Sequence, residues 1–105
     1  RAGAKIHAVS ASISTHVLDM GTGRPASGVR VELAREQTVL AAGETDADGR
    51  VARLADDLEP GQYAIVFWPP SPFFRRVELE VELGDGHHHI PLLVSPYGCA
   101  SYRGS

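Results

Sequence analysis

The amino-acid sequence predicts an all-β sandwich with little or no helix, and three features support that prediction. Residues 29–33 (VRVEL) and 77–83 (VELEVEL) alternate apolar and polar side chains, which is the pattern of strands with one buried face. Residues 63–68 (YAIVFW) form a continuous apolar run, as expected for a strand buried on both faces. The 11 glycines and 7 prolines interrupt the chain at short intervals, which leaves little room for long helices.

The remaining elements follow from the same reasoning. Residues 90–94 (IPLLV) predict a further apolar strand, and residues 54–58 predict one turn of helix. Residues 46–49 (DADG) predict a tight turn, because Gly49 permits a positive φ. The prolines of residues 69–72 (PPSP) exclude helix and predict an extended loop.

Length and composition indicate one globular domain over residues 1–105, with residues 1–10 as a partly flexible N-terminus. The formal charge is −3 and the basic residues are scattered, so no nucleic-acid partner is expected. No apolar run approaches the roughly 20 residues that span a membrane, so no membrane partner is expected. Cys99 is the single cysteine and cannot form an internal disulfide, which favours a reducing, cytoplasmic location.

Histidines are the most conspicuous candidates for chemistry. If residues 87–89 are extended, His87 and His89 share one face of the strand and His88 points the other way. Such a pair could bind a metal with a third ligand such as His16, although no recognised metal-binding spacing is present. Arg50, directly after the predicted turn, is either a solvated arginine or a clamp for an anion or carbonyl. From these residues alone, a hydrogen-bonded structural role for the histidines is the commoner outcome.

Four segments together carry a family resemblance: residues 13–19 (ISTHVLD), 45–50 (TDADGR), 87–98 (HHHIPLLVSPYG) and 102–105 (YRGS). Over residues 13–105 the chain resembles the transthyretin-like family of 5-hydroxyisourate hydrolases. The resemblance implies a transthyretin-like (prealbumin) sandwich of two four-stranded antiparallel sheets. It also implies a homotetramer, a dimer of dimers with active sites in the clefts between the dimers.

The activity implied by this resemblance is hydrolysis of the lactam ring of 5-hydroxyisourate to a ureidoimidazoline carboxylate, a step of urate (purine) catabolism. The substrate is a small heterocycle, and the resemblance implies neither a cofactor nor a metal. By the motif match, the catalytic residues are His16, Arg50 and His89. The residues expected to bind substrate are Tyr102, Ser105 and His87.

The sequence departs from the family pattern in three places, and these keep other functions open. Cys99 and Ala100 replace a tyrosine and a hydroxyl residue, His88 replaces a tyrosine, and the segment after Phe67 is too short for the family's helix. One alternative is a divergent enzyme that acts on another cyclic imide, lactam or hemiaminal in specialised metabolism. Alternatives from other classes are a non-catalytic protein that binds a small ligand, a partner-binding β-domain and, more weakly, a metal-dependent hydrolase.

Overall fold

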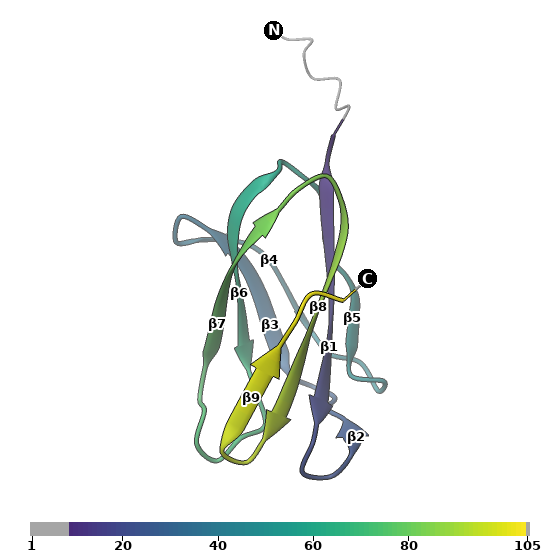
Figure 1. Ribbon diagram of the computed structural model, residues 1–105, viewed down its shortest axis with the longest axis vertical. Coiled ribbons are helices and arrows are strands. Elements are labelled where there is room, and N and C mark those ends of the chain that lie inside the picture. The colour runs from purple at the N-terminus through teal and green to yellow at the C-terminus, as the bar shows by residue number, and fades with distance from the viewer. Residues whose placement is uncertain (1–8, 105) are drawn as a thin grey trace, which may run out of the picture.

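The computed structural model describes residues 9–104, which form nine β-strands (Figure 1). No helix occurs in this part of the chain, so none there is long and apolar enough to cross a membrane. The predicted all-β sandwich is confirmed. The expected flexible N-terminus falls mostly on residues 1–8, which lie outside the described residues. In chain order the strands are β1 (Ala11–Asp19), β2 (Arg24–Pro25), β3 (Arg30–Arg35), β4 (Thr38–Glu44), β5 (Arg50–Leu58), β6 (Gly61–Trp68), β7 (Val77–Leu83), β8 (Gly86–Ser95) and β9 (Gly98–Ser101).

The strands form two sheets. One sheet has the order β4-β3-β6-β7 and is antiparallel throughout. The other has the order β2-β1-β8-β9, and β5 pairs with β1 on the same edge as the two-residue strand β2. The prediction of two four-stranded antiparallel sheets therefore needs two refinements. The short strand β2 makes the second sheet five-stranded, and β1 and β8 run parallel.

The core lies between the two sheets and follows from the period-two patterns. On β1 the side chains of Ile13, Thr15 and Val17 are fully buried, whereas the intervening residues point out of the sandwich. Thr15 is the polar member of this row, and its hydroxyl donates to the Ile90 carbonyl at 2.6 Å. Ile90 and its alternate neighbours on β8 complete the same layer.

Two local expectations have different outcomes. Residues 54–58 are not helical but continue β5, where Leu54 is buried in the core and Asp57 takes a positive φ of 56°. Residues 69–76 join β6 to β7 without a helix, so the predicted proline-rich loop is confirmed.

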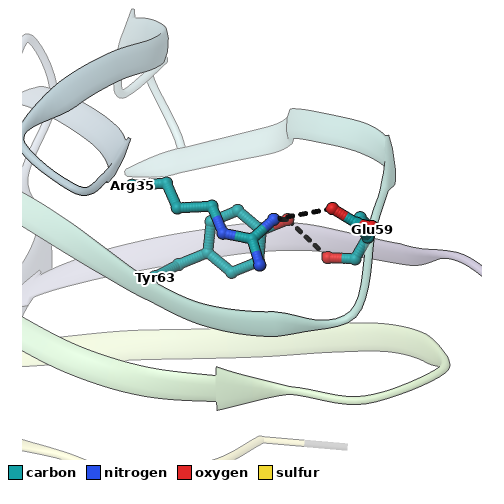
Figure 2. A network of polar contacts seen from close by, with 3 residues as sticks. All are labelled: Arg35, Glu59 and Tyr63. Carbon is teal, nitrogen blue, oxygen red and sulfur yellow. Dashed lines mark hydrogen bonds and ion pairs between the residues drawn. The ribbon is translucent and has the colours of Figure 1, made fainter.

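One end of the sandwich is closed by a polar contact between Arg35 at the end of β3, Glu59 in the β5–β6 turn and Tyr63 on β6 (Figure 2). The Arg35 guanidinium lies over the Tyr63 ring, 4.9 Å from its centroid, and pairs with the Glu59 carboxylate at 3.1 Å. The Tyr63 hydroxyl donates to the Glu59 carbonyl. Because Tyr63 is buried, this bond satisfies its hydroxyl while the ring packs in the core.

Candidate active site

The parallel pairing of β1 with β8 builds one polar surface on the outside of the sandwich. Ser12 lies opposite His87, and Ser14 lies opposite His89. Because side chains alternate along both strands, these four residues and His16 share the outer face. The strands thus bring together residues more than 70 positions apart in the sequence.

The serines and histidines on this face form a continuous hydrogen-bonded chain. The Ser12 hydroxyl lies 2.7 Å from His87 Nδ1, and the Ser14 hydroxyl lies 2.8 Å from His87 Nε2. The same Ser14 oxygen is also 2.8 Å from His89 Nδ1. Within residues 9–104 no hydrogen bond engages His89 Nε2, so this atom is available to a substrate.

Beside this hydrogen-bonded network lie His16, on β1, and Arg50, on β5, the strand on the other side of β1. They occupy opposite positions in the antiparallel pairing of β1 with β5. His16 Nε2 lies 2.9 Å from the Asp48 carbonyl, which can only accept, so Nε2 carries the proton and a neutral His16 has its lone pair on Nδ1. The His16 and His89 rings are 6.5 Å apart between centroids. Three strands therefore deliver His16, Arg50 and His89 to one surface.

The tight turn predicted for residues 46–49 is present, and it fixes the backbone of Arg50. One Asp46 carboxylate oxygen accepts from the backbone N–H groups of Asp48 at 2.9 Å and Arg50 at 3.0 Å. The backbone hydrogen bond from Arg50 is the main cause that lowers the pKa of Asp46, so the carboxylate stays charged at neutral pH. Gly49 completes the turn with φ of 77°, and a Cβ there would lie 2.6 Å from the Val17 carbonyl oxygen.

Electrostatics favour a neutral His89. Burial lowers the pKa of His89 below its ordinary value of 6.5, and interactions with the neighbouring His16, Arg50 and His87 lower it further. At neutral pH the ring therefore has one nitrogen lone pair and can accept a proton. Arg50 is exposed, so its guanidinium can meet a ligand from solvent. The arrangement suits a water-activating base beside a cationic donor for a developing oxyanion.

The other predicted site residues are distributed differently. His88 faces the core, as the alternation predicted, and its Nε2 lies 3.0 Å from the Gly84 carbonyl. Tyr102 lines a separate hollow of about 340 Å³ beside His88 and Ile90, at the edge facing β7. Ser105 lies outside the described residues. The segment before it does return to the histidines, because the Gly104 N–H donates to the His89 carbonyl at 2.7 Å.

The sequence alone did not identify Ser14, Ser12 or Asp46 as parts of the site. The signal for the serines was present, because both lie at even spacing before His16 and therefore on its face of a strand. What the sequence lacked was the register of β1 against β8. Within residues 9–104, no group of three or more metal-ligating side chains is arranged to hold an ion.

Comparison with known proteins adds independent information. The family model described as HIUase/Transthyretin family matches residues 13–104. The 5-hydroxyisourate hydrolase of Caulobacter vibrioides is 43% identical over 112 residues, which cover 89% of this chain and 97% of that protein. The structure of Klebsiella pneumoniae 5-hydroxyisourate hydrolase has a TM-score of 0.83 at 37% identity, covering 90% of this chain and 99% of the other. Sea bream transthyretin in complex with thyroxine has a TM-score of 0.76 at 24% identity, with 88% and 93% covered, which is a likeness in fold.

Proposed function

Since this chain belongs to the HIUase/Transthyretin family, we propose that it is a hydrolase that opens the lactam ring of 5-hydroxyisourate in urate breakdown. One observation carries the proposal: His16, Arg50 and His89, from three different strands, meet on one face of the sheet. A site of two imidazoles and a guanidinium has the groups that a hydrolysis of this kind needs.

The reaction consumes one water molecule. Its oxygen bonds to the ring carbonyl carbon, the carbon–nitrogen bond of the lactam breaks, and the leaving nitrogen takes one proton of the water. The other proton is released when the new carboxyl group ionises at neutral pH. The protein must therefore accept a proton from water, stabilise negative charge on the carbonyl oxygen and return a proton to nitrogen.

The geometry suggests how these tasks are divided. His89 is neutral and offers Nε2, so it accepts the proton of the attacking water and later returns it to the leaving nitrogen. His16, held through Nε2 by the Asp48 carbonyl, orients the water with Nδ1. The exposed guanidinium of Arg50 binds the electron-rich ring and stabilises the oxyanion.

The remaining predicted residues and the assembly belong to the same proposal. Tyr102 and Ser105 would contact the polar edge of the substrate, with His87 behind His89. Within the described residues, β7 and β9 each end a sheet with an unpaired outer edge, which supports a homotetramer assembled through strand pairing. The open site face is consistent with a cleft completed by a second dimer. A cytoplasmic location is supported by the exposed, free thiol of Cys99.

The test is a direct assay with freshly prepared substrate. Urate and uricase generate 5-hydroxyisourate, and its ultraviolet absorbance is followed with the wild type, with Arg50→Ala and without protein. The matched control is Arg53→Ala, which removes the same charge from the same strand, at an exposed residue that pairs with Asp56 at 3.6 Å. Arg50→Ala should lower kcat by about a hundredfold or more, the cost of removing an oxyanion donor.

The outcomes separate the candidate functions. Decay well above the spontaneous rate, lost in Arg50→Ala and kept in Arg53→Ala, supports the proposal. No acceleration by folded protein rejects 5-hydroxyisourate as substrate. Saturable binding of 5-hydroxyisourate without turnover would favour the alternative of a small-ligand binding protein.

A further inference from the structure

The hydrogen-bonded chain Ser12–His87–Ser14–His89 can exist in two arrangements. The Ser14 hydroxyl has a single proton, and it lies 2.8 Å from a nitrogen of each ring, so it can donate to only one ring at a time. In one arrangement His89 Nδ1 carries a proton and Ser14 donates to His87. In the other, Ser14 donates to His89 Nδ1 and accepts from His87 Nε2. The two arrangements differ in which His89 nitrogen is free to accept a proton.

On the basis of the proposed hydrolysis, we propose that Ser14 and His87 form a proton relay that lets His89 exchange one tautomer for the other without becoming a cation. The need for a relay follows from the surroundings of His89. Burial opposes a positive charge on the His89 ring, and the neighbouring His16 from β1, Arg50 from β5 and His87 from β8 oppose it further. A proton accepted at Nε2 is therefore better tolerated if another leaves from Nδ1.

The relay balances in both halves of the reaction. When water attacks, its proton bonds to His89 Nε2, the Nδ1 proton passes to Ser14, and the Ser14 proton passes to His87 Nε2. The positive charge then rests on His87. When the carbon–nitrogen bond breaks, the Nε2 proton goes to the leaving nitrogen and the two other protons move back. Over one turnover the Ser12–His87–Ser14–His89 network has no net gain or loss of protons, and the product carboxyl group releases its proton to solvent.

His87, at the exposed end of the hydrogen-bonded network, can hold that charge temporarily. His87 is exposed and, with Ser12, lines a hollow of about 510 Å³. The same hollow is also lined by the acidic residues Asp56 and Asp57 of β5 and Asp85 of the β7–β8 turn. His89, by contrast, is partly buried and lies beside Arg50. The end of the network that receives the charge is therefore the end exposed to solvent.

Four variants distinguish a relay from a structural hydrogen-bond network. Ser14→Ala interrupts the hydrogen-bonded network between His87 and His89, and Ser14→Thr restores the hydroxyl. His87→Gln keeps groups that can hydrogen-bond to both serines but cannot take up a proton. Ser95→Ala is the matched control, because it removes a serine hydrogen bond of 3.2 Å to the Gly98 carbonyl, on the same strand as His87 and outside the site. Thermal unfolding of each variant checks that it is folded.

We expect Ser14→Ala and His87→Gln to lower kcat by about tenfold or more with little change in KM. Ser14→Thr should regain most of the kcat that Ser14→Ala loses, and Ser95→Ala should have the kcat of the wild type. When kcat is plotted against the deuterium fraction of the solvent, several protons that move together give a curve and a single moving proton gives a straight line. We expect a curve for the wild type and a straight line for Ser14→Ala. A His87→Gln variant as active as the wild type would overturn the relay and leave a structural role.

A second measurement needs no substrate, so it remains decisive if the proposed hydrolysis fails. The ¹⁵N chemical shifts of the His89 ring, measured while the ring is neutral, report the populations of its two tautomers. The relay starts with the proton on Nδ1, so the wild type should populate the Nδ1–H tautomer, and Ser14→Ala, which removes the acceptor of that proton, should lower its population. A wild-type ring with its proton on Nε2, or a population unchanged by Ser14→Ala, would refute the relay whatever the substrate.

Discussion

Replacing Gly49 by alanine tests whether the turn before β5 is as tightly constrained as its geometry indicates. A Cβ at residue 49 would lie 2.6 Å from the Val17 carbonyl oxygen and 2.9 Å from Pro25 Cβ. The Val17 carbonyl is fixed because it accepts from the Ala26 N–H at 2.9 Å, and the Val17 N–H donates to the Gly49 carbonyl at 2.7 Å. Neither neighbour is the flexible end of a side chain, so the backbone itself must move.

A matched control at Gly28 separates the conformational cost of the alanine from the cost of its close contacts. Gly28 has φ of 73°, close to the 77° of Gly49, but a methyl group on its Cα would have no neighbour within 4 Å. Gly28→Ala should therefore cost only the conformational term, roughly 1–2 kcal/mol. Gly49→Ala adds overpacking of about 1–3 kcal/mol, for a total of about 2–5 kcal/mol. That is a large part of the roughly 5–15 kcal/mol by which domains are typically stable.

Urea unfolding followed by the fluorescence of Trp68, the single tryptophan, measures both variants. Protein concentration is held fixed, because any assembly of subunits contributes to the apparent stability. Gly49→Ala should also lower kcat, because residue 49 separates Asp48, which holds His16, from Arg50. Equal destabilisation by the two alanines would show that the turn yields to the added methyl group, and the reasoning from close contacts would be refuted.

Three further predictions concern single side chains. Because the pKa of His89 is lowered below 6.5, its neutral, proton-accepting form persists to lower pH. In a profile of kcat against pH from about 5 to 8, the midpoint of the acidic side should therefore lie below 6.5, and a midpoint above 6.5 would contradict this. Asp46→Ala frees the backbone that presents Arg50 and should lower kcat by up to about a hundredfold, measured beside Asp46→Asn, which keeps one acceptor oxygen. His88→Phe should leave kcat unchanged and cost about 1 kcal/mol in urea unfolding, because the Gly84 carbonyl loses a partner; a large loss of kcat would place His88 in the site.

The sequence predicted those strands whose pattern is decided locally. The alternation in residues 77–83 coincides with β7, because each apolar residue of that strand faces the core. By contrast, β4 (Thr38–Glu44) was not identified, because it is largely exposed and its apolar residues do not alternate. Residues 54–58 were wrongly expected to be helical, because their place on β5 depends on pairing with β1, which is distant in sequence.

The same distinction between local patterns and long-range pairing applies to the residues of the candidate site. His16, Arg50 and His89 were predicted from motifs, and the structure brings them to one face. Ser14 became visible only through the register that sets it opposite His89. Tyr102 was grouped with the histidines by its motif, but within one chain it lines a different hollow. A motif identifies residue types along the chain, whereas pairing between distant strands decides which of them meet.

The parallel pairing of β1 with β8 also determines when activity can appear during refolding. Ser14 and His89 are 75 positions apart, so their contact closes a loop that includes most of the chain. Contacts at such separation form late, because the entropy of loop closure must be offset before they contribute. A refolding intermediate with a finished β3-β6-β7 sheet would have regular secondary structure and no catalytic surface. The return of catalysis after dilution from urea should therefore lag behind the recovery of β-sheet circular dichroism.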